Sequence, residues 1–172
     1  MLIKDKIIII ITCFLSLFAI NLNLHAEEFN ISAVEIAIDK ENEIVTAKGS
    51  VKVTDMEGKI IRSDKVIYEK SKEFLQAEGS VEILDKEGNI LKTDKTTYDK
   101  MEEIITTYEN SELLIKEGYK LTTNSILYDV KKKIISSNQN SILTDLDGNL
   151  VTVNMFQYHI EKNLFSSVGE IK

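Results

Sequence analysis

The chain has 172 residues, of which 43% are hydrophobic, and it contains neither proline nor tryptophan. Its formal net charge is −7 at pH 7. This length allows one domain with a hydrophobic core or one short array of repeats. Nucleic acids and anionic lipid surfaces attract basic stripes, so the acidic composition argues against both as partners.

The first 26 residues differ in composition from the rest. Lys4 and Lys6 precede an apolar run over Ile7–Ile20, and Ala26 stands just before two glutamates. A basic start, an apolar run and a small residue at its end are typical of a secretory signal. We expect cleavage after Ala26 and export of 27–172 as one domain, an uncleaved membrane anchor being the alternative. Cleavage removes two lysines, one aspartate and the only cysteine, which leaves a net charge of −8 and no disulfide.

The remainder of the chain repeats with a period of 30 residues. The anchors are a tyrosine column, a glycine column and an Asp/Asn column: Tyr68, Tyr98, Tyr128 and Tyr158; Gly58, Gly88, Gly118 and Gly148; Asp64, Asp94, Asn124 and Asn154. A weaker copy precedes them, with Ile38 at the tyrosine position. Several columns in one phase indicate an array of equivalent structural units.

Each unit predicts two strands and two polar turns. Alternate residues over 75–83 are small or apolar and those between them are polar, which is typical of a half-buried strand. Segments such as DMEG at 55–58 place Asp first and Gly last, as in a type I turn closed by a left-handed glycine. A charged segment after each tyrosine makes the second turn. We therefore expect ten strands of about ten residues each between Phe29 and Lys172, and no helix after the signal.

The second strand of each unit carries two sets of apolar residues, one at odd-numbered and one at even-numbered positions, which in a regular strand would point to opposite faces. Ile61 belongs to one set, and Val66 and Tyr68 belong to the other. A β-bulge near Asp64 would bring both sets to the same side of the strand. We expect the Asp column to cap such a bulge or turn, and the tyrosines to pack at strand ends with their hydroxyls hydrogen-bonded.

No arrangement of residues in the sequence carries catalysis. The exported part has a single histidine, His159, and neither a Gly-x-Ser-x-Gly motif nor a phosphate-binding loop. The turn carboxylates at 145–148 fall short of calcium-loop spacing, and clustered metal ligands are not evident. We predict no enzymatic activity, no cofactor and no metal site.

The repeating unit resembles that of a known family. The segments SDKVIY at 63–68, AEGSV at 77–81 and TAKGSV at 46–51 resemble the OstA-like repeat of lipopolysaccharide transport proteins, namely LptA, LptC and the periplasmic amino-terminal part of LptD. The third and fourth units depart from it, because TYE at 107–109 and SNQ at 137–139 replace the Ala-x-Gly step.

The resemblance implies an all-β fold, a repetitive antiparallel β-jelly roll built from two-strand units and open at its ends. It also implies a periplasmic protein that binds lipid A acyl chains of lipopolysaccharide in an apolar slot. Other Lpt-type jelly rolls would join it end to end through edge strands. The inward-facing positions that would line the slot are Ile36, Ile38, Val45, Val51, Val53, Leu75, Val81, Ile83, Ile105, Leu113, Ile135, Leu143 and Phe165.

Several alternatives stay open at this point. The last unit stops at Lys172 in the middle of an element. This ending is expected for an LptA-like bridge whose last strand pairs with a partner. It is equally expected for the amino-terminal part of an LptD-like, outer-membrane-associated protein that is truncated here. An uncleaved signal would instead indicate an LptC-like protein. The apolar rows are compatible with an open slot or with a dry core. A dry core would favour a β-solenoid structural or adhesive protein without a lipid ligand.

Overall fold

The computed structural model describes residues 29–168, and the expected signal at 1–26 lies outside that range. Within it the chain forms fifteen strands and one short 3-10 helix. These are β1 (Phe29–Ser32), β2 (Glu35–Asp39), β3 (Ile44–Asp55), β4 (Ile60–Glu69), η1 (Lys70–Lys72), β5 (Phe74–Leu84), β6 (Ile90–Asp99), β7 (Ile104–Tyr108), β8 (Ser111–Leu114), β9 (Lys120–Thr123), β10 (Leu127–Asp129), β11 (Ile134–Ser137), β12 (Ser141–Thr144), β13 (Leu150–Val153), β14 (Met155–His159) and β15 (Leu164–Val168). None of the described segments is a helix of the length and apolarity that a membrane crossing requires.

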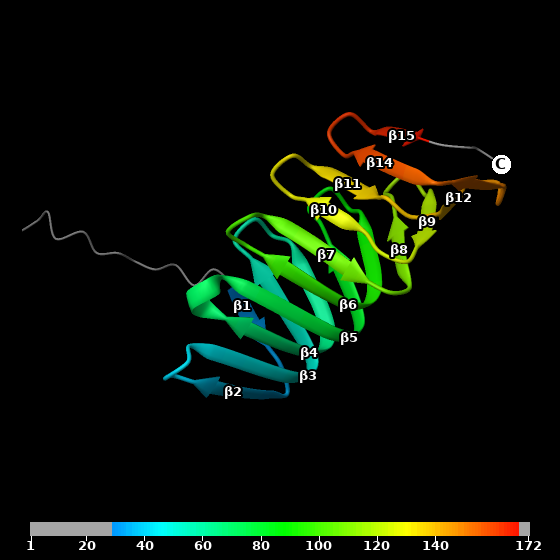
Figure 1. The fold of residues 1–172 in the computed structure, drawn as a ribbon. Coiled ribbons are helices and arrows are strands. Elements are labelled where there is room, and N and C mark those ends of the chain that lie inside the picture. The colour runs from blue at the N-terminus through cyan, green and yellow to red at the C-terminus, as the bar shows by residue number, and fades with distance from the viewer. Residues whose placement is uncertain (1–28, 169–172) are drawn as a thin grey trace, which may run out of the picture.

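The strands form two layers, and four long strands, β3, β4, β5 and β6, each run through both of them (Figure 1). One half of β3 pairs with β2 and the other half with β1; likewise β6 pairs with β7 through one half and with β8 through the other. Layer A therefore contains β2, half of β3 to β6, and β7, β10, β11, β14 and β15. Layer B contains β1, the other halves, and β8, β9, β12 and β13. All pairs are antiparallel, which confirms the expected all-β jelly roll.

The long strands pass from one layer to the other at a corner made of β-bulges. Gly49 and Gly79 have φ values of +77° and +78°, and Ser50 and Ser80 directly after them are also left-handed. The β3–β4 and β5–β6 ladders shift register at these residues. A bulge bends its strand and increases the local twist, so each strand turns from layer A into layer B here.

The bulge expected near Asp64 is present. The β4–β5 ladder shifts register between Arg62 and Lys65, so Ile61 and Tyr68 are both buried although their sequence parities differ. In the next unit Asn110 Nδ2 donates a hydrogen bond of 2.6 Å to Asp94 Oδ2 across the corner. The Asp column thus lies beside the bulges, as predicted.

From β7 to β14 each strand is divided at the corner into two short strands, so among the described residues the expectation of continuous strands of about ten residues holds only for β3 to β6. Buried hydroxyls occupy this part of the corner. Thr107 Oγ1 lies 2.6 Å from Ser111 Oγ and accepts a 2.8 Å hydrogen bond from the Ile126 N–H, and Thr123 Oγ1 lies 3.2 Å from Ser137 Oγ. Side-chain hydroxyls compete with the ladder for backbone partners, which interrupts the strands.

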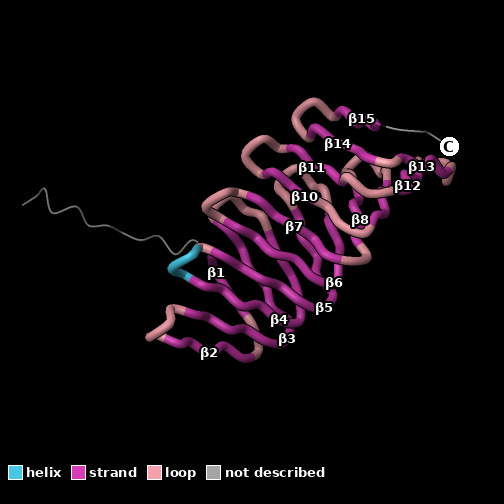
Figure 2. Tube along the Cα trace, in the orientation of Figure 1, coloured by secondary structure: helices cyan, strands magenta, loops and turns pink. Residues whose placement is uncertain are grey.

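The turns at the far ends of layer B have the predicted chemistry. Asp55 Oδ1 accepts hydrogen bonds from the Glu57 and Lys59 N–H groups, at 3.0 and 2.8 Å. Gly58 has φ +86° and donates its N–H to the Asp55 carbonyl at 3.2 Å. Figure 2 shows these turns and those of layer A at the strand ends. The turns of layer A include the short helix η1.

Candidate functional site

The inner side of layer A carries a row in which tyrosines alternate with apolar residues. The strand registers place each tyrosine directly opposite a residue of the neighbouring strand on either side. In spatial order the row is Ile38, Val45, Tyr68, Leu75, Tyr98, Ile105, Tyr128, Ile135, Tyr158 and Phe165. The tyrosine column is therefore part of the interior lining, a role that the sequence pattern did not reveal.

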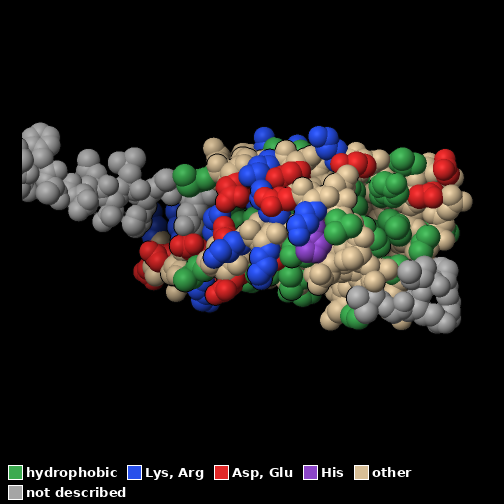
Figure 3. Space-filling view, turned by 90° about the horizontal axis from the view of Figure 1, so that it is seen from above, with side chains coloured by type: hydrophobic (Ala, Val, Ile, Leu, Met, Phe, Trp, Pro, Cys, Tyr) green, Lys and Arg blue, Asp and Glu red, His purple; other side chains and the backbone are tan. Residues whose placement is uncertain are grey.

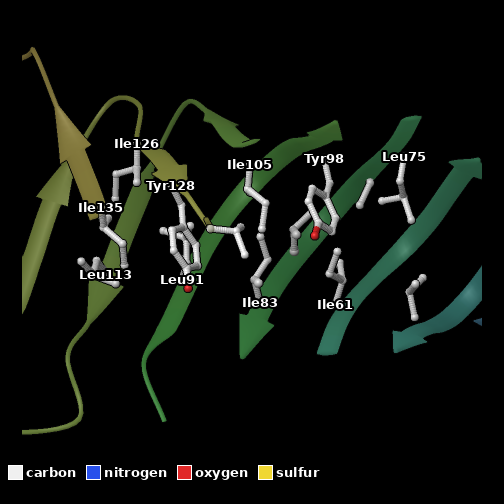
Figure 4. Close-up of a cluster of buried hydrophobic side chains, with 14 of the residues drawn as sticks. Ile61, Leu75, Ile83, Leu91, Tyr98, Ile105, Leu113, Ile126, Tyr128 and Ile135 are labelled. Atoms are coloured by element: carbon white, nitrogen blue, oxygen red, sulfur yellow. The ribbon is translucent and has the colours of Figure 1, made fainter. Parts of the chain in front are cut away.

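The inner side of layer B carries a second row, which is aliphatic throughout. In spatial order it is Ile31, Val53, Ile61, Ile83, Leu91, Leu113, Leu121, Leu143 and Val151. Figure 4 shows Leu75, Tyr98 and Ile105 of the first row across from Ile61, Ile83 and Leu91 of the second. The two rows face each other along the jelly roll.

The structure brings most of the sequence-predicted lining residues to this interior. Eight of them are at most 2% exposed: Val51, Val53, Leu75, Val81, Ile83, Ile105, Leu113 and Ile135. Val45 is also buried. Glu82 projects to the outer side between Val81 and Ile83, where it forms an ion pair of 2.9 Å with Arg62. Most side chains of the two rows have almost no exposed surface, so an acyl chain would reach them where the layers part.

The remaining predicted residues lie at the two ends of the rows. Ile36 and Ile38 on β2 are 45% and 62% exposed. At the other end Leu143 and Phe165 are half-buried, and the Phe165 ring stacks on Phe156 with centroids 5.7 Å apart. The apolar rows thus run past the closed core and reach solvent at both ends.

Opposite the corner, the turns of layer B face the turns of layer A along a line that we call the seam. Lys100 Nζ of layer A lies 3.9 Å from Glu57 Oε1 of layer B. The Phe29 ring of layer B packs edge-on against Tyr68 and Tyr98 of layer A, at centroid distances of 5.0 and 5.8 Å. These contacts close the seam near its amino-terminal end.

Lys59 is a buried cation at the same place, with 4% of its surface exposed. Its Nζ donates to Asp55 Oδ2 at 3.2 Å. It also lies 5.1 Å from the ring centroid of Tyr98 and 5.9 Å from that of Tyr128. The repeat pattern did not single out Lys59, although one signal was available: the equivalent position of two other units is asparagine, at Asn89 and Asn149.

Burial controls the ionisation of two tyrosines in the row. It raises the pKa of Tyr128, and the negative charges of Asp85 and Glu87 raise it further. Burial also raises the pKa of Tyr158, whose hydroxyl donates to Asn163 Oδ1 at 3.1 Å. Both phenols, like any tyrosine with the ordinary pKa of about 10, are neutral at physiological pH, and the raised pKa keeps them neutral at more alkaline pH as well.

The outer faces are charged, in contrast to the inner rows. Glu78 pairs with Lys65 and Lys95 of the two neighbouring strands, at 3.5 and 3.1 Å. Such exposed ion pairs add little to the stability of the fold, but their charges make it favourable for the outer faces to remain solvated. Figure 3 shows charged side chains gathered over the amino-terminal part of one face and more apolar side chains towards the carboxy terminus.

No metal-binding arrangement occurs within residues 29–168, where no group of three or more His, Cys, Asp or Glu side chains is placed to hold an ion. His159 ends β14 and lies opposite Ile134 and Leu164 in the sheet. The facing rows and the seam are therefore the features from which a function can be argued.

The fold is similar to that of a solved periplasmic protein. LptH of Pseudomonas aeruginosa, described as the LptA-homologous periplasmic component of the conserved lipopolysaccharide transport device, matches with a TM-score of 0.55 and 17% sequence identity. The match covers 62% of this chain and 79% of LptH. This chain has an LptA-like β-jelly roll fold. No protein-family model matches the sequence, and no curated protein matches it.

Proposed function

We propose that this chain is a periplasmic protein of lipopolysaccharide transport that holds lipid A acyl chains between its two layers. One observation carries the proposal: two apolar rows face each other along the jelly roll and reach solvent at both ends. The similarity in fold to LptH supports it. The proposal involves no catalytic step, no cofactor and no metal.

A lining of this kind lowers the cost of moving acyl chains through water. Burying one methylene contributes about 0.8 kcal/mol, so a chain of about a dozen carbons faces a barrier on the order of 10 kcal/mol. Neighbouring strands lie about 4.8 Å apart, so the ten strands of layer A give a lining roughly 40 Å long. An acyl chain between the rows would keep their apolar surface out of water once the layers part.

We assign the lining to the inward-facing residues expected from the sequence, from Ile36 on β2 to Phe165 on β15. To these we add the tyrosines of layer A, of which Tyr98 and Tyr128 lie at the middle of the row. Their neutral rings offer apolar surface together with a hydroxyl for the polar end of a ligand.

We further propose that the first 26 residues direct export and that 27–172 form the periplasmic domain. The charge and hydropathy pattern of the leader supports this assignment. An LptA-like bridge is the simplest role for such a domain. Two other roles are compatible with the same domain. It could be the amino-terminal domain of an LptD-like, outer-membrane-associated protein, or the periplasmic part of an LptC-like anchored protein.

Partners of the same fold would join at the sheet edges. Among the described strands, β1 and β2 at one end and β13 and β15 at the other pair on one side only. Their exposed apolar side chains include Ile36, Ile38, Leu150 and Leu164. An open edge with apolar side chains favours β-augmentation by another chain.

A structural or adhesive β-array without a lipid ligand is the second candidate. The observation that favours it is the tight burial of the inner rows, where Leu75, Ile105 and Leu113 have no exposed surface. A packed core of this kind stabilises a fold without needing an occupant.

Site-specific photo-crosslinking separates the two candidates. A photoreactive residue at Val81, Ile83 or Leu113 in cells that make lipopolysaccharide should give lipopolysaccharide adducts, because these positions face the interior. The matched control is Glu82, which faces outward between two of them and should give none. The absence of adducts at every inward position would favour the structural array.

A further inference from the structure

The seam is closed by different chemistry at its two ends. Towards the amino terminus two lysines reach across it, Lys59 to the rings of Tyr98 and Tyr128 and Lys100 to the neighbourhood of Glu57, beside the edge-on contacts of the Phe29 ring. Towards the carboxy terminus the corresponding turns bury aliphatic side chains instead, namely Ile115, Val130 and Ile160. Parting this charged half exposes the Phe29 ring together with ammonium and carboxylate groups that water solvates well, whereas parting the other half exposes the three aliphatic side chains.

Lys59 contacts the opposite layer although its own turn does not require a lysine. In the equivalent turn Asn89 donates from its backbone N–H and its Nδ2 to the two carboxylate oxygens of Asp85, both at 2.8 Å. Asn149 makes the same two bonds to Asp145. Asparagine therefore satisfies this turn, and the longer Lys59 side chain additionally reaches the rings of Tyr98 and Tyr128.

The layers can separate more easily at the seam than at the corner. At the corner β3, β4, β5 and β6 are continuous from one layer to the other, so covalent chain and ladder hydrogen bonds hold the layers together. Across the seam the contacts are between side chains, chiefly those of Phe29, Lys59 and Lys100. Separation would therefore hinge at the corner and open at the seam.

We propose that the charged half of the seam is a lateral port through which long acyl chains enter the interior, with Lys59 as the latch that holds it shut. This inference rests on the proposed function, since it states how the ligand reaches the facing rows. The ligand class is an amphiphile with one or more long alkyl chains. Its chains enter sideways between the layers, and its polar head stays among the charged turns of the seam.

Cross-linking the seam tests the port. Glu57→Cys and Lys100→Cys, introduced together with Cys13→Ser, place the only two cysteines of the chain on facing turns of the two layers. A short bis-maleimide between them should hold the layers together. We expect at least a ten-fold loss in the rate of uptake of cis-parinaric acid, a long-chain fatty acid that becomes fluorescent in apolar surroundings.

The matched control joins two turns of the same layer. Glu57→Cys with Glu87→Cys bridges neighbouring turns of layer B, which together line a shallow surface pocket, and leaves the seam free. This cross-linked variant should take up the probe at the rate of the unmodified protein. Equal uptake by both cross-linked variants would overturn the port while leaving the lipid-binding function intact. No uptake by any variant, cross-linked or not, would count against the proposed function itself and the port with it.

The latch is tested by Lys59→Asn, the residue that other units of the chain use at this position. Two cation–π contacts across the seam are lost while the turn keeps its hydrogen bonds. Uptake of the probe should be roughly three- to ten-fold faster. Asn89→Ala serves as the control, because it alters an equivalent turn that has no cation, and it should leave the uptake rate unchanged. If Lys59→Asn also leaves the uptake rate unchanged, Lys59 is not the latch.

Discussion

Replacing Gly79 by alanine tests the bulge that turns β5 from layer A into layer B. Gly79 has φ +78°, a conformation that costs an L-residue about 1–2 kcal/mol. The new Cβ would also overlap Oδ2 of Asp64 and lie 2.9 Å from Cβ of the same residue. Displacing Asp64 adds about 1–3 kcal/mol. We therefore expect Gly79→Ala to lower the free energy of unfolding by about 2–5 kcal/mol in total.

Two other glycines provide graded controls for the same backbone strain. Gly58 has φ +86°, but a methyl group added there would meet no atom within 4 Å, so Gly58→Ala should cost only about 1–2 kcal/mol. At Gly49 the methyl would lie 3.1 Å from Cβ of Val34, a looser contact than at Gly79 and a closer one than at Gly58, so Gly49→Ala should fall between the two. Urea unfolding followed by circular dichroism gives all three values at constant m. Equal losses for Gly79→Ala and Gly58→Ala would refute the close approach of Asp64.

Two further predictions concern assembly and pH. Val34 donates its N–H to the Gly49 carbonyl of β3. Because N–H groups alternate in direction along a strand, the N–H of Ala37 on β2 points to the free edge of the sheet. Ala37→Pro removes this donor, so it should weaken self-association measured by light scattering without loss of the β-strand signal in circular dichroism. Because the pKa of Tyr128 is raised, its contribution to stability is complete below the ordinary tyrosine pKa of about 10 and is lost as pH rises above it towards the folded-state pKa. Tyr128→Phe should therefore move the alkaline unfolding midpoint to higher pH, whereas Tyr119→Phe at an exposed position should not; an unchanged midpoint in Tyr128→Phe would contradict this reasoning.

The local pattern of the sequence was sufficient for the strands and turns, whereas the jelly-roll architecture was implied by the resemblance to the OstA-like repeat. Alternation of apolar and polar residues depends only on which side of a strand faces the core, so the strands and their inward residues, such as Val81 and Ile83, could be predicted from residue order. The turn beginning at Asp55 is equally local, since its hydrogen bonds join residues at most four apart. The parity change around Asp64 pointed to the bulge for the same reason.

Tertiary structure alone decided how the layers meet. The break of the later strands depends on hydroxyl contacts such as that between Thr123 and Ser137, whose partners come from different strands. The burial of Lys59 beneath Tyr98 depends on how far the corner bends one layer towards the other, and no periodicity within a unit encodes that angle. Residue order determines which side of a strand is apolar, but contacts across the seam arise only when strands distant in the chain are folded face to face.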